Sequence, residues 1–468
     1  MEDNRPQIDE KIIQKNTIEL LKSMGYIFIS QKDNLKFRNG KLLDVLLKNI
    51  LENQLQKING FEYKGIKYKF SSKNISNAIE SLDESLNEGL ISANIKITDQ
   101  LVLGNAYQEE LEGGVKKSFS LKYIDFKNPQ NNIFHFTEEF SVLRETLNER
   151  DKTRRPDIVL FINGIPFGVI ELKSAIVETE QGISQMLRNQ KKEEIARLFK
   201  FTQILLAGNN HSPQYATIDT PKKFWATWEE DNSEILNTLV DKRLASKLDM
   251  TILSLFAKNR VLELLSSFII FDNRVKKIAR YQQYFAIKEI IKKINKLDST
   301  GRRGGGLIWH TQGSGKSLTM VMLTRVIKRE IINSKVIVVT DRKDLDRQIH
   351  ATFNKSEIEA SRAGSGRELV GLLQSGKSVI TTLIHKFETV KKEQIIIDDP
   401  NIFILVDESH RTQEGDLNKA MNIVFPSACY LGFTGTPLMK KDKSTNSKFG
   451  GLLHKYTIDQ AVRDKAVL

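Results

Sequence analysis

Five apolar runs in the second half of the sequence constrain the fold more than any other feature. They alternate with helix-like segments between residues 305 and 436, and they are GGLIWH, KVIVVT, SVITTL, NIFILVDE and CYLGFTGT. Strands that are apolar on both faces are typical of parallel sheets, because crossover helices cover such a sheet on both sides. The sequence therefore predicts an α/β fold with a parallel sheet in this half of the chain.

A glycine-rich loop follows the first apolar run and precedes a helix-like segment. Such a loop presents backbone N–H groups to phosphates, while its lysine reaches the β- and γ-phosphates and its hydroxyl binds Mg²⁺. His310 stands where the general pattern has its first glycine. We predict an ATP site here, with Ser317 as a Mg²⁺ ligand. Its members are Thr311, Gln312, Gly313, Ser314, Gly315, Lys316 and Ser317.

Two acids end the fourth apolar run, in the sequence FILVDESH. A carboxylate at the end of a strand can hold Mg²⁺, and a second one can orient or deprotonate the attacking water. An acidic pair in this position is by itself more often a cap or a solvated turn. The phosphate-binding loop on the same predicted sheet favours the catalytic interpretation. We therefore predict that Asp407 holds the Mg²⁺ and that Glu408 acts in catalysis.

A second candidate site lies in the segment RPDIVLFINGIPFGVIELKS, residues 155–174. Metal-dependent cleavage of a phosphodiester needs carboxylates that hold Mg²⁺ and a lysine that stabilises charge or positions water. Asp157, Glu171 and Lys173 have these chemical types. Salt-bridged Glu and Lys residues on exposed strands are common, so the pattern alone favours an ordinary hairpin. Upstream of an ATP site in a basic protein, a nuclease becomes the better interpretation.

The register of this hairpin decides whether the three side chains can meet. The period of two along a strand puts Glu171 and Lys173 on one face. A plain two-residue loop at Asn163 and Gly164 would place Asp157 opposite Ile170, on the other face. We therefore predict a three-residue turn or a one-residue bulge, either of which brings Asp157 opposite Glu171.

The net charge of the chain favours a polyanionic partner. Lys and Arg number 71 against 58 Asp and Glu, which gives +13 and a pI near 9.4. Nucleic acid is the first candidate, although a well-solvated Lys-rich surface has the same composition. The single cysteine, Cys429, excludes an internal disulfide and a cysteine-based metal cluster. With no membrane-length apolar run and no signal-like N-terminus, a cytoplasmic protein without membrane attachment is predicted.

Several motifs together resemble the first half of a superfamily 2 helicase-type motor. In order along the chain they are HTQGSGKS, VVTDRKDLDRQ, TTLIHKF, VDESHR and GFTGTP. The resemblance implies that Gln283 recognises adenine and that His410 belongs to the nucleotide site. It also implies that Thr434 to Pro437 couple hydrolysis to motion. The residues it places near the DNA backbone are Thr340, Asp341, Arg342, Thr381 and Thr382.

The whole arrangement resembles the motor and restriction subunit (R, HsdR-type) of type I restriction enzymes. In that family a PD-(D/E)xK nuclease domain precedes two RecA-like motor domains. The resemblance implies an endonuclease domain at 1–230 with its core at about 135–210, a mainly helical connector at 231–279 and a first RecA-like domain at 280–468. It implies ATP-dependent translocation and cleavage of double-stranded DNA with ATP and Mg²⁺. Methylation and specificity subunits would be the partners, and the assembly would use S-adenosylmethionine.

The sequence departs from the family pattern in two places. The family has Gln-x-x-x-Tyr on the helix after the lysine, whereas here Asn189 follows Gln185. Gln185 is the candidate for the supporting role near the DNA. The sequence also stops after the first motor domain, so we expect a fragment that binds ATP, hydrolyses it poorly and does not translocate alone.

Two other functions fit part of the pattern. One is an ATP-gated DNA-binding scaffold with an inactive nuclease fold. The other is a type III restriction subunit, which also joins a motor to a nuclease. In type III subunits the nuclease follows the motor, so the order of the motifs here argues against that class.

Overall fold

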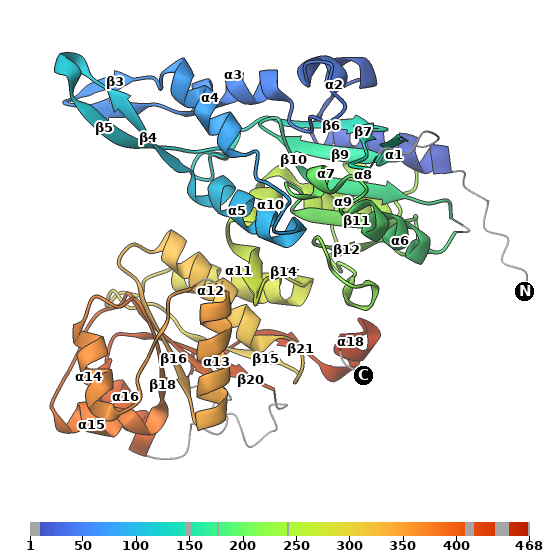
Figure 1. The fold of residues 1–468 in the computed structure, drawn as a ribbon. Coiled ribbons are helices and arrows are strands. Elements are labelled where there is room, and N and C mark those ends of the chain that lie inside the picture. Colours follow the sequence, from blue (N-terminus) through green and yellow to red (C-terminus); the bar gives the residue numbers. More distant parts are fainter. Residues whose placement is uncertain are drawn as a thin grey trace, which may run out of the picture. The chain divides into compact units, whose positions relative to one another are not determined.

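The chain folds as two compact units (Figure 1). The computed structural model describes residues 10–146, 152–175, 177–240, 243–356, 358–407, 416–435 and 449–466. Unit 1 comprises Met1–Ile269 and Arg274–Ile278, and unit 2 comprises Ile270–Asn273 and Ala279–Leu468. The boundary between the units therefore falls within a short segment near residues 269–279.

Unit 1 is built on a mixed sheet with the strand order β1-β6-β9-β10-β11-β12. The strands are β1 (Ile27–Phe28), β6 (Phe134–Glu138), β9 (Ile158–Ile162), β10 (Ile165–Leu172), β11 (Ile204–Gly208) and β12 (Gln214–Ala216). The central strands β9 and β10 are antiparallel, and β10 runs parallel to β11. Every residue of β9, β10 and β11 is buried, so both faces of the middle of the sheet are covered.

Ten α-helices surround this sheet among the described residues of unit 1. They are α1 (Glu10–Ser23), α2 (Gln31–Phe37), α3 (Lys48–Ile58), α4 (Ser72–Ser81), α5 (Leu90–Leu103), α6 (Thr179–Asn189), α7 (Ala196–Phe199), α8 (Ser233–Leu239), α9 (Lys247–Phe256) and α10 (Lys258–Glu263). Throughout the described part of the chain, no helix has both the length and the apolar character that a membrane span requires.

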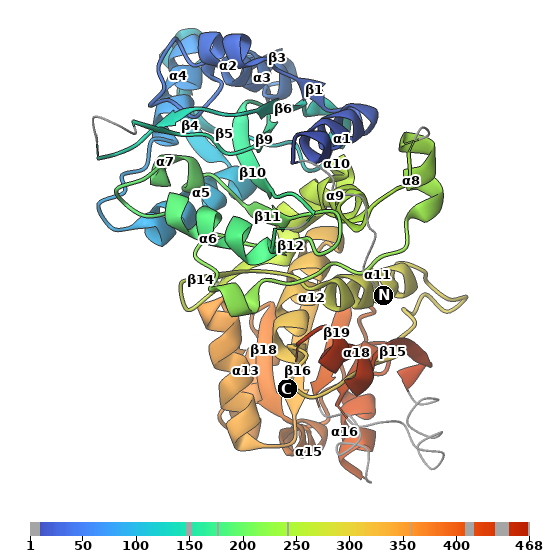
Figure 2. The ribbon, with the colours of Figure 1, turned by 90° about the vertical axis from the view of Figure 1, so that its right-hand side faces the viewer.

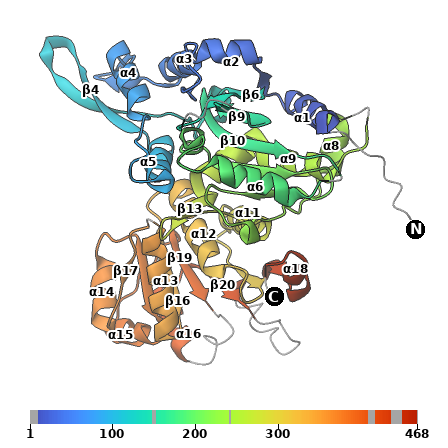
Figure 3. The same ribbon diagram turned by 45° about the vertical axis from the view of Figure 1, so that its right-hand side comes forward.

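Two further hairpins of unit 1 pack together and extend away from the central sheet (Figure 1 and Figure 3). They are β2 (Phe61–Tyr63) with β3 (Ile66–Tyr68), and β4 (Asn105–Glu110) with β5 (Lys116–Leu121). The rings of Phe61 and Phe119 stack with their centroids 3.9 Å apart, which joins the hairpins through an aromatic contact. The short strands β7 (Val142–Leu143) and β8 (Thr153–Arg154) form a separate antiparallel pair.

Unit 2 contains the predicted parallel sheet, with the strand order β17-β18-β16-β19-β20-β15-β21. The strands are β15 (Gly306–His310), β16 (Lys335–Thr340), β17 (Ser361–Arg362), β18 (Val379–Leu383), β19 (Ile402–Asp407), β20 (Cys429–Thr434) and β21 (Leu452–Tyr456). All neighbouring pairs are parallel. The five apolar runs form β15, β16, β18, β19 and β20, so the predicted α/β fold is confirmed.

Helices cover both faces of the sheet in unit 2 (Figure 2). They are α11 (Tyr281–Ile294), α12 (Lys316–Glu330), α13 (Lys343–Lys355), α14 (Gly366–Gln374), α15 (Phe387–Lys392), α16 (Asp416–Val424) and α18 (Ile458–Arg463). Helices α14, α15 and α16 share one apolar cluster with Ile337, Val339 and Ile404 of the sheet. Helices α12 and α13 cover the other face, as right-handed crossovers between parallel strands require.

The segment predicted as a helical connector contains strands as well as helices. Residues 231–279 include α8, α9, α10 and a five-residue π-helix at Leu264–Phe268, followed by β13 (Ile269–Asp272) and β14 (Val275–Ile278). Most of this segment belongs to unit 1. The division into an endonuclease domain, a connector and a motor domain stays a prediction.

Two hairpin turns offer a matched test of how unit 1 is packed. Gly164 and Gly65 both occupy the second position of a two-residue turn, with φ of +88° and +78°. A Cβ on Gly164 would lie 2.8 Å from the Leu47 carbonyl oxygen, whereas a Cβ on Gly65 would meet nothing within 4 Å. Gly65→Ala therefore adds backbone strain alone, and Gly164→Ala adds strain and a backbone clash.

We expect Gly65→Ala to destabilise unit 1 by about 1–2 kcal/mol, the cost of a left-handed non-glycine residue. Gly164→Ala should cost about 3–5 kcal/mol, because the overpacking adds to that strain. Urea unfolding followed by tryptophan fluorescence, with each variant compared to the unsubstituted chain, measures both changes. Equal losses for the two variants would contradict the tight packing of this turn against α3.

Candidate functional site

A bulge in the central hairpin of unit 1 brings the three predicted nuclease residues together. Ile162 pairs with Ile165 across a two-residue turn, but the register shifts between Pro166 and Gly168, so that Ile170 pairs with Ile158. The predicted one-residue bulge is confirmed. Asp157, which precedes β9, accepts a hydrogen bond at 2.6 Å from the Leu172 N–H through its Oδ2 atom. Its carboxylate therefore lies against the end of β10, beside Glu171.

Glu171 and Lys173 form a buried ion pair at this end of β10. The Lys173 Nζ atom lies 3.1 Å from Glu171 Oε1 and donates to the Leu172 carbonyl oxygen at 2.7 Å. The Glu171 side chain is fully buried, and its Oε2 atom has no hydrogen-bond partner. An unsatisfied carboxylate oxygen in a buried position is costly, so the site has an unmet demand for a cation or a proton.

Burial shifts the protonation of both acids. Burial, together with the neighbouring Asp157 carboxylate, raises the pKa of Glu171 to about 8 against the opposing effect of Lys173. Burial likewise raises the pKa of Asp157 to about 6, although the Leu172 N–H opposes this shift. Burial lowers the pKa of Lys173, but the negative charges of Glu171 and Asp157 outweigh it and raise that pKa above its ordinary value. Paired acids with shifted pKa values are typical of functional sites.

The residues at this site fit a Mg²⁺ ion that keeps part of its water shell. Two carboxylates lie at one end of β10, and the unpartnered Glu171 Oε2 atom is an available oxygen ligand. Among the described residues, no group of three or more His, Cys, Asp or Glu side chains is arranged to hold a metal. Mg²⁺ commonly binds to one or two protein carboxylates and several waters, which agrees with this donor set.

Helix α6 covers the ion pair of Glu171 and Lys173. A Cβ built on Gly182 would lie 3.4 Å from Lys173 Cγ and 3.8 Å from Glu171 Cγ, so the helix backbone passes directly over both side chains. Gln185 is half-buried and follows Gly182 by one turn on the same side of the helix. Asn189, where the family pattern has tyrosine, is buried a further turn along. The supporting role of Gln185 stays a prediction.

The glycine-rich loop of unit 2 connects β15 to α12 as predicted. Gly313 and Gly315 have φ of +84° and +85°, a conformation that favours glycine and lets the backbone curl around the start of the helix. Lys316 begins α12, and its Nζ atom donates to the His310 carbonyl oxygen at 3.4 Å. The Ser314 hydroxyl is buried without a hydrogen-bond partner. This conformation agrees with a loop shaped for an anionic ligand.

Gln283 lies beside this loop. Its Nε2 atom donates to the carbonyl oxygens of Gly315 and Ser314 at 3.2 and 3.5 Å, and its Oε1 atom accepts from the Arg280 N–H at 2.9 Å. A Cβ on Gly315 would lie only 2.6 Å from Gln283 Nε2. The start of α11 is therefore fixed against the loop, and the recognition of adenine by Gln283 stays a prediction.

The other predicted motor residues lie at the carboxyl ends of neighbouring parallel strands, in so far as they are described. Asp407 ends β19 and is buried, and the single strand β20 separates β19 from β15. Ser317 lies in the first turn of α12. Thr340 ends β16 next to β18, which carries Thr381 and Thr382. Glu408, His410, Thr436 and Pro437 lie outside the described residues.

Two protein families match successive parts of the chain. Residues 7–224 match the family described as the type I restriction enzyme R protein N terminus, and residues 282–468 match the SWI2/SNF2 ATPase family. The resemblance to type I restriction R subunits is thereby confirmed.

Two relatives extend this R-subunit resemblance along nearly the whole chain. The chain is 30% identical over 486 residues to a Methanocaldococcus jannaschii protein assigned as the type I restriction enzyme MjaIXP endonuclease subunit, covering 98% of this chain and 45% of that protein. It is 27% identical over 498 residues to the type I restriction enzyme HindI endonuclease subunit of Haemophilus influenzae, and the match covers 98% of this chain and 46% of that protein. The chain thus spans about half the length of these relatives.

One solved structure that resembles part of the chain is a fragment assigned to an HsdR subunit of a type I restriction enzyme from Vibrio vulnificus. It is 18% identical, covers 70% of this chain and 56% of its own, and superposes with a TM-score of 0.31.

Two residues near the candidate sites were missed by the sequence analysis. His454 lies on β21, and its Nδ1 atom is 2.9 Å from His310 Nε2. Burial, with smaller contributions from His454 and Lys316, lowers the pKa of His310 to about 3, so His310 stays uncharged near neutral pH. Glu10 on α1 approaches Lys173, with Oε1 4.0 Å from Nζ. None of these pairings has a local sequence signal.

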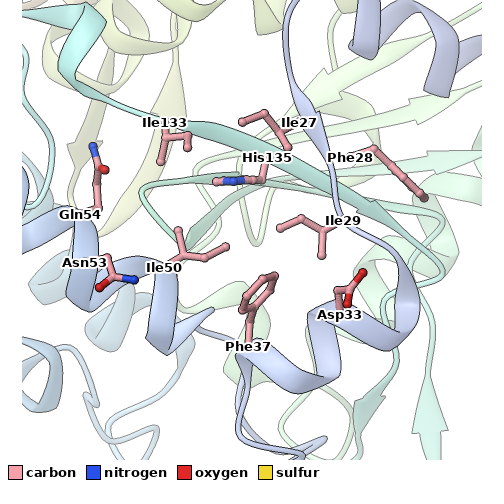
Figure 4. Close-up of a pocket in the computed structure, with 10 residues that line it drawn as sticks. All are labelled: Ile27, Phe28, Ile29, Asp33, Phe37, Ile50, Asn53, Gln54, Ile133 and His135. Carbon is pink, nitrogen blue, oxygen red and sulfur yellow. The ribbon is translucent and has the colours of Figure 1, made fainter.

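Unit 1 also contains a cavity of about 440 Å³ between β1, β6, α2 and α3 (Figure 4). Six of its ten lining residues are apolar, and the other four are polar. The lining residues are Ile27, Phe28, Ile29, Asp33, Phe37, Ile50, Asn53, Gln54, Ile133 and His135. None of these belongs to the predicted nuclease site, so the cavity is separate from the paired acids.

The raised pKa of Glu171 predicts how stability depends on pH. In a metal-free buffer the folded state holds the Glu171 proton up to about pH 8, whereas the unfolded state releases it near the ordinary value of 4.5. The stability contributed by this proton is complete below pH 4.5 and is lost as pH rises towards 8. We expect Glu171→Gln to be more stable than the unsubstituted chain by about 2–4 kcal/mol at pH 8, and the difference to shrink towards pH 4.5.

Urea unfolding of both proteins between pH 4.5 and 8.5 with EDTA measures this difference. Glu52→Gln, an exposed change on α3, is the matched control and should show no such trend. A Glu171→Gln effect that stays constant with pH would contradict the raised pKa. Adding Mg²⁺ should reduce the difference, because the ion stabilises the carboxylate form.

Proposed function

We propose that this chain carries the DNA-cutting site and the first motor domain of a type I restriction R subunit. The supporting observation is that one polypeptide contains both a cluster of Asp157, Glu171 and Lys173 and a glycine-rich loop at the start of α12. The proposed activity is ATP-dependent translocation of duplex DNA followed by endonucleolytic cleavage of both strands. The relatives at 30% and 27% identity, which are named as endonuclease subunits, support this assignment.

At the nuclease site, the two acids would hold Mg²⁺ and the lysine would face the phosphate. When bound, the ion would neutralise the phosphate and supply an activated water for hydrolysis. Asp157 is fixed by the Leu172 N–H, and Glu171 offers the oxygen that lacks a partner. Lys173 can turn from Glu171 to stabilise charge on the phosphate. Gln185 would contact the DNA from α6.

At the motor site, backbone N–H groups of the loop and the N-terminus of α12 would bind the ATP phosphates. Lys316 would reach the β- and γ-phosphates, while Ser317 and Asp407 would hold Mg²⁺. Glu408 would orient the attacking water, and Gln283 would recognise adenine beside His410. Thr340, Asp341, Arg342, Thr381 and Thr382 would contact the DNA backbone.

The proposed partners are duplex DNA and the methylation and specificity subunits of a cytoplasmic type I restriction complex. The net charge of +13 favours binding to DNA. S-adenosylmethionine would be used by the assembly and not by this chain. Specific recognition of a DNA sequence would come from the specificity subunit.

A DNA-binding scaffold with an inactive nuclease fold is the second candidate. The direct ion pair between Glu171 and Lys173 favours it, because two side chains that neutralise each other could serve stability alone. The unpartnered second oxygen of Glu171 favours the nuclease instead. Cleavage by a Glu171 variant separates these two functions.

We expect Glu171→Gln to lower double-strand cleavage by about 100-fold or more, as loss of a charge-stabilising group does. The measurement uses the assembly reconstituted with its methylation and specificity subunits, plasmid DNA, ATP and Mg²⁺. ATP binding should be unchanged. Glu180→Gln, on the exposed start of α6, is the matched control and should cleave normally. Normal cleavage by Glu171→Gln would support the scaffold.

Lys316→Ala tests the motor site separately. Loss of its charge-assisted hydrogen bonds should weaken ATP binding by about 10–100-fold. Binding is measured on the 468-residue chain by competition of ATP against a fluorescent ATP analogue. Lys328→Ala, in the last turn of α12, is the control and should bind as the unsubstituted chain does. Unchanged binding by Lys316→Ala would refute the proposed phosphate loop.

A further inference from the structure

A hydrogen-bonded cluster of unit 2 lies outside the residues assigned to either site. It consists of Tyr281, Tyr456 and Asp464, from three separate segments. The Tyr456 Oη atom donates to Asp464 Oδ2 at 2.8 Å, and the Tyr281 Oη atom donates to the same oxygen. The two tyrosine rings meet edge to face with centroids 6.1 Å apart. One carboxylate oxygen therefore fixes both phenol groups.

The Asp464 carboxylate is held inside the unit by these contacts. Its side chain is only 7% exposed, and it directly follows α18. Its other oxygen, Oδ1, lies 3.6 Å from the Nε atom of Arg463, whose side chain is mostly exposed. Hydrogen bonds to an ionised acceptor are stronger than neutral ones, and low exposure strengthens them further. The cluster is therefore a firm connection between its three segments.

Each tyrosine of the cluster adjoins a different part of the proposed nucleotide site. Tyr281 is the first residue of α11, two positions before Gln283, whose amide donates to the loop carbonyls. Tyr456 ends β21, which pairs in parallel with β15, and its carbonyl oxygen accepts the Thr311 N–H at 3.0 Å. Tyr281 thus adjoins the glutamine that would face the base, and Tyr456 adjoins the loop that would hold the phosphates.

We propose that Asp464 is a positioning residue for nucleotide binding, which holds the start of α11 and the phosphate loop in register through Tyr281 and Tyr456. The proposal rests on the nucleotide site proposed above. A binding site needs its donors fixed before the ligand arrives, because a misplaced group forfeits much of its binding energy. Asp464 would hold these groups in place from outside the site, without a contact to the nucleotide.

We call the hydrogen bonds from Tyr281 and Tyr456 to Asp464 the clamp, and each of the two bonds is one arm of it. Removing one arm or the other predicts a different loss of nucleotide binding. The Tyr456 arm supports the Thr311 N–H and the phosphate loop, which ATP and GTP would use equally. The Tyr281 arm supports Gln283, which would contact the base and distinguish adenine from guanine. A role in packing alone would instead lower stability and weaken both nucleotides in the same proportion.

The experiment compares ATP and GTP binding by the 468-residue chain with Mg²⁺, each nucleotide competing against a fluorescent ATP analogue. Asp464→Asn should weaken ATP binding about 10-fold and lower the preference for ATP over GTP about 5-fold, since it loses a charge-assisted acceptor. Tyr281→Phe should lower mainly the preference, and Tyr456→Phe should weaken both nucleotides alike. Asp459→Asn, an exposed change on the same helix, is the matched control and should bind normally.

A double variant separates positioning from general destabilisation. If Tyr281 acts through Asp464, the Tyr281→Phe, Asp464→Asn pair should bind no more weakly than Asp464→Asn alone. Tyr281→Phe removes a single hydroxyl, so it keeps the test open if Asp464→Asn fails to fold. An unchanged ATP-to-GTP preference in every variant would overturn the clamp.

The outcome for Lys316→Ala distinguishes the two proposals. Lys316-dependent ATP binding together with normal binding by the clamp variants would overturn only the role of Asp464. Absence of ATP binding by the unsubstituted chain would overturn the nucleotide site and the clamp together.

Discussion

The one-residue bulge between Pro166 and Gly168 is the constraint on which the proposed nuclease site depends. Without it, Asp157 would face the opposite side of the sheet from Glu171, because one step of register turns every side chain over. The turn at Asn163 and Gly164 keeps the strands closely paired at one end. The bulge then corrects the register before the acids are reached. A local irregularity therefore decides whether a core hairpin can also carry chemistry.

The buried carboxylate at this site lowers the stability of the folded chain. Glu171 is fully buried with one oxygen unpartnered, and burial raises its pKa to about 8. A folded core normally avoids such a group, and the surrounding sheet of buried apolar strands must offset its cost. Glycine at position 182 lets α6 pack directly against Glu171 and Lys173. Features of this kind, which oppose stability, are typical of sites kept for a ligand.

Much of the architecture could be predicted because its determinants are local. Apolar runs indicated β15, β16, β18, β19 and β20, and the arithmetic of hairpin pairing required a correction of register between the turn and Asp157. The contacts that were missed join residues far apart in the chain. His310 and His454 are 144 positions apart, and Tyr281 and Asp464 are 183 apart. Such pairs leave no periodicity or spacing in a single sequence, so only the fold reveals them.

A helix that carries no recognisable motif lies close to the Asp157, Glu171 and Lys173 cluster. Helix α1 carries Glu10 to within 4.0 Å of Lys173, although its sequence resembles an ordinary amphipathic helix. At 44% exposure the Glu10 side chain remains in contact with solvent, while the lysine it approaches is only 12% exposed. The environment of Lys173 is therefore set partly from outside the central hairpin.

In each unit, segments that are distant in the sequence complete the candidate site. In unit 1, the acids and the lysine sit on one hairpin, but α6 and α1 complete their surroundings. In unit 2, the glycine-rich loop lies between β15 and α12, but its first N–H is held by β21 and, through Tyr456, by Asp464 beyond α18. Because each site needs segments that are distant in sequence, neither motif can acquire its geometry before its whole unit has folded. A short peptide that carries either motif would therefore keep the residues and lose the site.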